Sequence, residues 1–524
     1  MNHQHFYFKP TCLFTVVWTI FFLFFSLTTT AAPSKDKITL QYHQWLEMKD
    51  KAIPELKKAI FDANWRIRTH ALLAMGKTGD QTLVPVILKK LEEDPHLSVK
   101  NCAVIALKTL KARQAVPILI NMLQEQLSGN IRVKTPTKLL IQALGEIGDP
   151  RATDILYQYL FIHNQTERIA ATEALIAIKD ESVSTRILDE QIRFKTDSRT
   201  KEAAMILGEI PVPGAESFLL EIVTEKDRVA GTAAIVSLGK IKSKKAIPIL
   251  LTGLQKESGQ HQAKIAEALI AIDSPEAVDP LCLIIKDNGQ EVAMKAASVL
   301  ARMTEPSISF KVFKLFNSNQ SVNEPAAYVL GFKKYRGAVP LIRERLKDET
   351  QPGQDQLAKS LGWLDDFESV ALLIEVAQRS SQNGSLGAAA ALGDLKAVKA
   401  VPTLIDLLGT NNKQLLAQVV VSLGNIEDQR AANPLIKLSY ETGSRFTLLI
   451  AEALGKISGD VVFKFIQDSI ASGDKERLRI AAYTLRHYKV TETQVPYFKS
   501  LLEHNNASVS KAAHQVLRRI ADKD

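Results

Sequence analysis

Residues 385–408 read SLGAAAALGDLKAVKAVPTLIDLL, and this stretch contains one complete unit of a repeating pattern. Its apolar side chains have the 3.6-residue spacing of a helix with one buried face, at Ala388, Ala391, Leu392 and Leu395. A short polar stretch then leads to Pro402, and proline suits the first turn of a helix, where its missing N–H costs nothing. The stretch therefore predicts two helices joined by a short turn.

The same pattern recurs along almost the whole chain. The position of Gly393, called the marked position below, has equivalents at 76, 108, 145, 176, 208, 239, 270, 301, 331, 362, 393, 424, 455, 486 and 518. Thirteen of the fourteen intervals are 30 to 32 residues, and Leu precedes the marked position in fourteen of the fifteen units. Ala stands five places before it in ten units, so neighbouring helices can approach closely. A period of this kind is typical of stacked helical repeats.

These observations predict an all-α fold, a superhelical α-solenoid of about 15 helical pairs of about 31 residues. We expect residues 1–31 to be a signal peptide or an N-terminal membrane anchor. Residues 32–60 are expected to be an N-terminal capping segment, with a degenerate first unit around Trp45 and Pro54, and residues 61–524 the solenoid. Since each unit contacts only its neighbours, the solenoid is expected to form one continuous domain.

The first residues have the order of a secretory signal. Residues 11–27 form a continuous apolar run, TCLFTVVWTIFFLFFSL, between Lys9 and the small residues TTTAAPSK. We expect cleavage after Ala31. The alternative is an uncleaved anchor, because these 17 residues just reach the length of a membrane span. The protein is thus expected to be exported, either to the periplasm or outside the cell, or to be held at the inner membrane by residues 11–27.

The charge balance does not favour nucleic acid as a partner. Removing residues 1–31 takes away one Lys and no acid, which leaves 65 basic and 57 acidic residues and a net charge of +8. Nucleic-acid binding needs a clustered basic stripe, whereas Lys and Arg are scattered here among almost as many acids. We therefore expect protein partners and no nucleic acid.

The repeats carry a family likeness. ALLAMGKTGDQTLVPVIL at residues 71–88, together with residues 385–408, resembles the bacterial HEAT-like repeats named after phycobilisome lyases. The resemblance covers nearly all of residues 38–524 and implies a HEAT-type solenoid. Many such repeats carry Arg eight places before the marked position, and here only Arg68, Lys100 and Arg168 are basic there. The polar ladder between repeats that the family implies is therefore expected to be mostly absent.

The resemblance says little about function, because one fold hosts many activities. Phycobilin lyases of this repeat type attach tetrapyrroles in the cytoplasm, and HEAT-like DNA glycosylases act on a genome. An export signal argues against both roles. Deoxyhypusine hydroxylase-like proteins bind two irons through His-Glu pairs, and the chain has no His-Glu dipeptide. The commonest use of the architecture, protein binding or scaffolding, is what remains.

The sequence contains no motif typical of a catalytic or metal-binding site. The sequence has no H-E-x-x-H, no C-x-x-C and no closely spaced cluster of carboxylates and histidines. We expect no catalytic residue, no cofactor and no metal site. Cys102 and Cys282 lie nearly six repeats apart, too far for a disulfide, and are expected to be free, buried thiols. Two hypotheses stay open: an extracytoplasmic interaction scaffold without catalysis, or a cofactor- or chromophore-handling, lyase-like subunit whose active site needs a partner.

One surface is a candidate for partner binding. On the second helix of each unit, the positions three before and one after the marked position point away from the predicted core. In two consecutive units these positions hold Tyr328, Phe332, Lys359 and Trp363. If the second helices line the concave surface, as is usual in this family, the aromatic rings form an exposed anchor for a partner, with Lys333 and Lys359 at its edge. The alternative is that the residues after the marked position are half-buried and only widen the core.

Overall fold

A computed structural model describes residues 35–129, 134–196, 199–225, 227–379, 381–441 and 444–521. These residues form helices and no strand. The predicted signal or anchor at residues 1–31 lies outside the described residues. Among the helices that are described, none has both the length and the apolar character that crossing a bilayer requires.

The helices follow the predicted pairs. The first helices of the pairs are α3 (Ile53–Ala59), α5 (Val84–Glu93), α7 (Val116–Leu127), α9 (Thr153–Gln158), α11 (Glu181–Asp189), α14 (Ala215–Thr224), α16 (Ile247–Lys256), α18 (Val278–Asp287), α20 (Ile308–Ser318), α22 (Val339–Lys347), α24 (Val370–Ala377), α26 (Val401–Asp406), α28 (Ala432–Glu441), α30 (Gly459–Ala471) and α32 (Val495–Ser500). Helix α2 (Lys35–Met48) precedes the first pair, and α12 (Gln191–Thr196) is an extra short helix.

Each marked position lies on the second helix of a pair. These second helices are α4 (Trp65–Thr78), α6 (Leu97–Thr109), α8 (Thr137–Ile147), α10 (Gln165–Ile178), α13 (Thr200–Glu209), α15 (Arg228–Lys240), α17 (Gly259–Ile272), α19 (Gln290–Arg302), α21 (Asn323–Phe332), α23 (Gln354–Trp363), α25 (Ser385–Asp394), α27 (Lys413–Ile426), α29 (Ser444–Ile457), α31 (Lys475–His487) and α33 (Ala507–Ala521). Prolines such as Pro85 and Pro402 stand in the first turn of the following first helix, as predicted. The α-solenoid prediction is confirmed.

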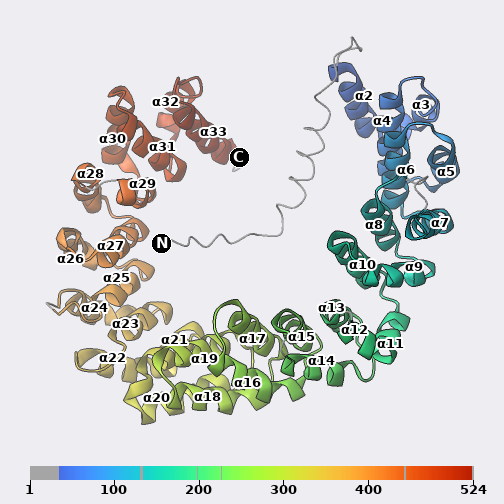
Figure 1. Ribbon diagram of the computed structural model, residues 1–524. Coiled ribbons are helices and arrows are strands. Elements are labelled where there is room, and N and C mark those ends of the chain that lie inside the picture. The colour runs from blue at the N-terminus through green and yellow to red at the C-terminus, as the bar shows by residue number, and fades with distance from the viewer. Residues whose placement is uncertain are drawn as a thin grey trace. The chain divides into compact units, whose positions relative to one another are not determined.

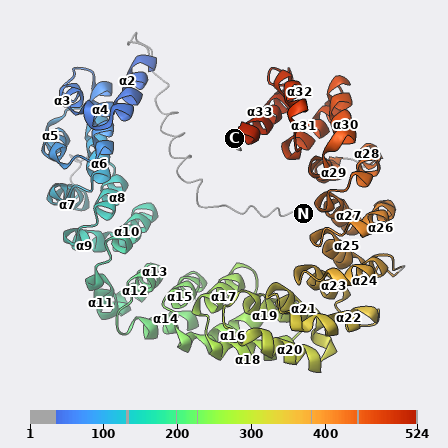
Figure 2. The ribbon, with the colours of Figure 1, turned by 180° about the vertical axis from the view of Figure 1, so that it is seen from behind.

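The described chain divides into two compact units, one ending at Ala215 and the other beginning at Glu216. In the compact unit that begins at Glu216, Figures 1 and 2 show the helices in two layers along a curved stack. The second helices, α15 to α33 by odd numbers, form the inner layer, and the first helices form the outer layer. Side chains on the inner layer that point away from the core therefore face the concave side of this unit.

Glycine at the marked position permits close contact between neighbouring second helices. A Cβ atom on Gly424 would lie 2.8 Å from the Cα atom of Ala453, and one on Gly239 would lie 2.9 Å from the Cα atom of Ala268. Ala453 and Ala268 stand two places before the marked position of the next unit. Backbones at this separation leave no room for a side chain on the first of the two helices.

In most repeats, the turn that follows the second helix has a left-handed residue three places after the marked position. Gly79 and Gly148 hold this place in two units, with φ of 79° and 71°. Lys111, Lys179 and Lys242 hold it in others, with φ of 50°, 59° and 55°. Left-handed backbone is unfavourable for residues with a Cβ atom, so these turns store strain that glycine would relieve.

The position eight places before the marked residue, where a polar ladder between repeats was expected to be mostly absent, also carries bonds within a repeat. Two glutamines at this position hydrogen-bond to carbonyl groups at the end of the first helix of their own pair. Gln262 Nε2 donates to the carbonyl oxygen of Leu254 at 2.7 Å, and Gln354 Nε2 to that of Arg345 at 3.0 Å. The buried amide satisfies carbonyl groups that the helix end leaves without an intrahelical partner.

The arginines at this position, eight places before the marked residue, make stronger hydrogen bonds than the glutamines do, because both partners are charged. Arg68 forms a two-pronged pair with Asp94, at 2.8 Å from Nε and 3.0 Å from Nη2, and both side chains are largely buried. Burial alone would raise the pKa of Asp94, but hydrogen bonds from Arg68 and from the His96 backbone hold it below its usual value. Arg168 joins Glu202 of the next unit at 2.8 Å. Arg68 and Arg168 thus join neighbouring repeats, whereas the Gln262 and Gln354 amides donate within their own repeats.

Candidate functional site

The structure brings the four predicted residues together on α21 and α23. The rings of Tyr328 and Phe332 stack with centroids 6.2 Å apart, and Tyr328 meets Trp363 edge to face at 5.6 Å. The Lys359 ammonium lies 5.0 Å from the centroid of the Trp363 ring. Tyr328 thus bridges two neighbouring repeats. We call these four residues the aromatic surface.

The two residues that follow the marked position differ in burial. Phe332 is 51% exposed. Trp363 is half-buried, and its ring lies 3.1 Å from the place a Cβ atom of Gly331 would take. Trp363 therefore contributes to packing between repeats, as the alternative held, whereas Phe332 presents its ring to solvent.

Lys333 does not lie free at the edge of this surface. Its ammonium group donates to the carbonyl oxygen of Met303 in the preceding unit. Burial lowers the pKa of Lys333, an effect that Asp273 partly offsets. The expectation of an edge cation at this position is thus wrong, because the long side chain reaches back across the repeat boundary. Lys359 is the cation that does lie at the aromatic rings.

Two acidic residues beside the aromatic surface were missed from the sequence. Glu324 and Asp355, called the carboxylate pair below, stand seven places before the marked positions of α21 and α23. They lie one helical turn before Tyr328 and Lys359, so the same face carries them. Following the same helix face four residues further toward the N-terminus would have found them.

The electrostatics of the carboxylate pair are unfavourable. Burial, and then the nearby charge of Asp355, raise the pKa of Glu324, while a hydrogen bond from Gln290 acts in the opposite direction. Asp355 Oδ1 accepts the backbone N–H of Gly387 at 2.9 Å. Within the described part of the chain, neither carboxylate forms an ion pair. The two negative charges thus have no compensating cation there.

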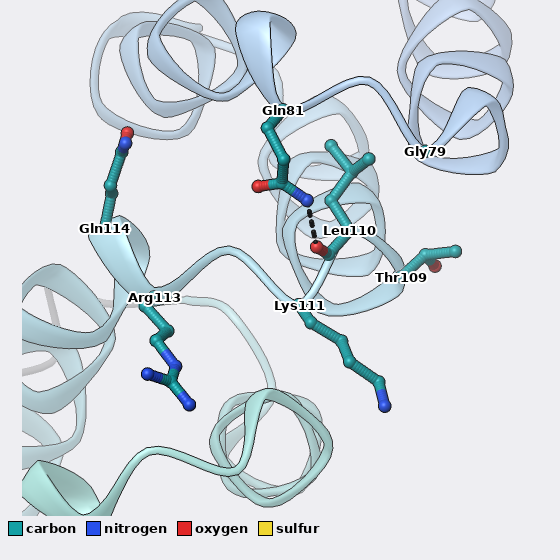
Figure 3. Close-up of a pocket in the computed structure, with 7 residues that line it drawn as sticks. All are labelled: Gly79, Gln81, Thr109, Leu110, Lys111, Arg113 and Gln114. Atoms are coloured by element: carbon teal, nitrogen blue, oxygen red, sulfur yellow. Dashed lines mark hydrogen bonds between the residues drawn. The ribbon is translucent and has the colours of Figure 1, made fainter.

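A hollow of about 480 Å³ lies in the compact unit that ends at Ala215 (Figure 3). Its lining comes from the turns that follow α4 and α6, namely Gly79, Gln81, Thr109, Leu110, Lys111, Arg113 and Gln114. Gln81 Nε2 donates to the carbonyl oxygen of Leu110 at 2.6 Å, and the Lys111 and Arg113 side chains extend away from this bond. The hollow is the space between two consecutive turns, and no reactive group converges on it.

Among the described residues, neither metal ligands nor thiols form a second candidate site. In the ranges that the structure describes, no group of three or more His, Cys, Asp or Glu residues could hold a metal ion. Cys102 and Cys282 are free thiols, as predicted, Cys102 buried and Cys282 half-buried. Burial raises the pKa of Cys102 to about 12 and that of Cys282 to about 11, the latter also through Asp279. Both thiols are therefore protonated at neutral pH and are poor nucleophiles.

Paired helices stacked on their neighbours define the chain as an α-solenoid. Three stretches, residues 47–133, 197–260 and 372–455, match the family model of HEAT repeats. HEAT repeats thus occur in these three stretches, and part of the chain is similar to a phycocyanobilin lyase subunit.

One curated relative is the phycocyanobilin lyase subunit alpha of Nostoc sp. (strain PCC 7120 / SAG 25.82 / UTEX 2576). It is 29% identical over 128 residues, which cover 23% of this chain and 46% of the lyase subunit. The match thus spans less than half the length of that relative.

Solved structures with a similar helical fold include importin beta, Kap121p and a phycocyanin lyase complex. Importin beta aligns with a TM-score of 0.42 and 12% identity over 92% of this chain and 80% of its own. Kap121p bound to Ste12p aligns with a TM-score of 0.43 and 14% identity over 90% and 58%. The CpcE–CpcF complex of phycocyanin lyase from Nostoc sp. PCC7120 aligns with a TM-score of 0.26 and 15% identity over 51% and 93%. These are general likenesses of helical solenoids and identify no function.

Proposed function

We propose that this HEAT-repeat protein is an exported scaffold or adaptor that binds a protein partner on the aromatic surface and has no catalysis of its own. The observation that carries the proposal is the exposed ring of Phe332, which is 51% accessible and stacks on Tyr328. Both lie on an inner-layer helix of the second unit. Aromatic anchors on a rigid, concave support are the usual centre of a protein interface.

The geometry around Phe332 suits this role. The Tyr328 and Trp363 rings hold each other edge to face, so the site is largely formed before a partner arrives. A preformed site loses little side-chain freedom on binding, and this improves affinity without additional contact area. Protein binding is also the role for which stacked helical repeats provide extended surfaces.

Site-specific photocrosslinking tests the proposal. A photoreactive phenylalanine analogue replaces Phe332 in the cell that makes the protein, and a matched variant carries it at Phe310 of α20, which is 65% exposed on the outer layer. We expect a discrete crosslinked species from position 332 that is absent from position 310. Identical products from both positions, or none from position 332, would contradict the proposal.

A second candidate function is a chromophore-handling, lyase-like subunit that needs a partner to complete its active site. The observation that favours it is the 29% identity with the phycocyanobilin lyase subunit alpha over 128 residues. Under this alternative, the protein purified from its native source absorbs visible light through a bound tetrapyrrole. Under the scaffold proposal, the absorption ends with the aromatic band in the ultraviolet.

A further inference from the structure

We infer that the partner segment bound at the aromatic surface is a short extended peptide that presents a Lys or Arg side chain and, three to four residues away, an apolar one. This inference rests on the proposed function and specifies the chemistry of the partner. The cation would lie between Glu324 and Asp355, and the apolar side chain would lie against Phe332. The inference rests on the charges of the surface, the exposed ring and the size of the patch.

The charges of α21 and α23 leave the carboxylate pair uncompensated. Lys359 is one turn from Asp355 on the same helix face, where an ion pair at this spacing is usual. Its ammonium group instead lies over the Trp363 ring, 5.0 Å from the centroid. Lys334, the other nearby cation, pairs with Asp365 at 2.9 Å. Both cations therefore have other partners within the described residues.

Helix stability does not explain the placement of the two acids. An acidic residue in the first turn is favourable because of the helix dipole, and Glu324 and Asp355 both lie in first turns. That effect accounts for each acid separately. It does not account for acids on the same face of two packed helices, where the charge of Asp355 opposes the ionisation of Glu324. A cation from a partner would relieve this repulsion.

The exposed aromatic ring favours a peptide that carries an apolar side chain in addition to the cation. The position of Lys359 shows that a ring of this surface accepts an ammonium group on its face. Phe332, at the other end of the surface, has an exposed ring without a described cation over it. An aliphatic or aromatic side chain can bury this ring, which the protein leaves 51% exposed.

The size of the patch sets the length of the peptide. From seven places before the marked position to one place after it is eight residues, or about 12 Å along a helix. Neighbouring helices lie about 10 Å apart. An extended chain advances about 3.3 Å per residue, so three to four residues cross the patch. The next helix, α25, has only Leu386, Ala390 and Asp394 at the equivalent positions, so charged and aromatic side chains occur together on α21 and α23 alone of these three.

Selection from a phage-displayed library of random dodecamer peptides on the purified protein tests the inference. We expect enrichment of peptides with Lys or Arg three to four residues from an apolar residue. Their affinity is expected to fall at least tenfold in Glu324→Gln/Asp355→Asn and in Phe332→Ala, and to weaken as salt is added. Enrichment of acidic or uncharged peptides, equal affinity for the carboxylate variant, or no enrichment would overturn the inference.

The carboxylate variant is designed to keep the fold. Gln at position 324 can still bond to Gln290, and Asn at position 355 can still accept the Gly387 N–H. Glu167→Gln/Glu181→Gln is the matched control, since it removes the same charge from first turns of α10 and α11. Wild-type affinity is expected for this control.

The same variants separate this inference from the proposed function. If Phe332→Ala loses the crosslinked cellular partner while Glu324→Gln/Asp355→Asn retains it at all salt concentrations, the scaffold function stands and the cationic segment is wrong. If both variants retain the partner, the proposed function itself fails.

Discussion

Arg68 and Asp94 form a buried ion pair whose contribution a pH series can isolate. Asp94→Asn leaves Arg68 without its counter-charge, and breaking a buried pair in this way costs about 3–5 kcal/mol. The pKa of Asp94 lies below its usual value of 3.8 in the folded state. The stabilisation is therefore complete above the unfolded pKa and is lost as the pH falls through the folded pKa.

We expect Asp94→Asn to lower Tm strongly near neutral pH and progressively less in acid, as measured by thermal unfolding followed by circular dichroism. Asp154→Asn is the control, because its pair with Arg186 is 3.5 Å long and the Asp154 side chain is 91% exposed. That variant is expected to cost at most about 1 kcal/mol. Equal losses at the two positions would show that the Arg68 pair has no special role.

Lys179 illustrates the strain stored in the turns. Its φ of 59° is left-handed, and its side chain is exposed. A left-handed residue with a Cβ atom costs roughly 1–2 kcal/mol, partly offset in a glycine variant by the freedom that glycine loses on folding. Lys179→Gly is therefore expected to raise the free energy of unfolding by about 0.5–1 kcal/mol, measured by urea denaturation.

The same change inside a helix has the opposite sign. Lys464 is exposed in the middle of α30, and Lys464→Gly is expected to destabilise by about 1 kcal/mol. A loss of stability in Lys179→Gly comparable with that in Lys464→Gly would contradict the strained-turn account.

At the scale of the helix, stacking depends on the missing side chain at the marked position. Gly424→Ala places a Cβ atom 2.8 Å from the Ala453 Cα atom, a contact that forces α27 and α29 apart. Overpacking of this kind costs about 1–3 kcal/mol, although alanine is the better helix former. Gly289→Ala is the control, since no atom lies within 4 Å of the new methyl group. Chemical denaturation measures both, and an unchanged Gly424→Ala variant would refute the close-packing account.

The helices could be predicted because their signals are local. A buried column with a period of 3.6, as at Ala388 and Leu392, and a proline in the first turn, as at Pro402, act through the residues of one helix. The Gly424 contact is different, since it involves an alanine 29 residues later on another helix. The reason for the glycine could be found only after the helices were placed side by side.

The site was predictable in part for the same reason. Tyr328 and Phe332 meet within one helix, and Trp363 follows from the repeat period. Lys333 was misplaced because its long side chain reaches a carbonyl group of another unit. The bonds of Gln262 and Gln354 within their own repeats were missed because only a basic residue was sought at that position, whereas an amide also donates to a carbonyl group.

At the scale of the whole molecule, the proposal of export makes a prediction about the mature chain. The apolar residues 11–27 and the small residues that follow predict cleavage after Ala31. Intact-mass and N-terminal peptide analysis of the protein from its native source is expected to place the first residue at Ala32. A chain that retains Met1 in the membrane fraction would replace the cleaved signal with an anchor.

The aromatic surface is the proposed site of partner binding, and the rest of the solenoid holds it in place. Phe332→Ala removes an exposed ring and is expected to leave Tm unchanged, whereas Trp363→Ala also removes a contact with Gly331. Phe310→Ala/Phe367→Ala is the matched control, since both rings are 65% exposed and lie outside the aromatic surface.

The most direct test is the affinity of these variants for the crosslinked partner, measured together with Tm. Truncation of a hot-spot residue costs about 2 kcal/mol or more, which is roughly a thirtyfold loss of affinity. We predict this loss for Phe332→Ala at an unchanged Tm, and wild-type affinity for Phe310→Ala/Phe367→Ala. Wild-type affinity in Phe332→Ala would show that the partner binds elsewhere. A loss of binding that appears only together with a large fall in Tm would show that Phe332 supports the core instead of binding the partner.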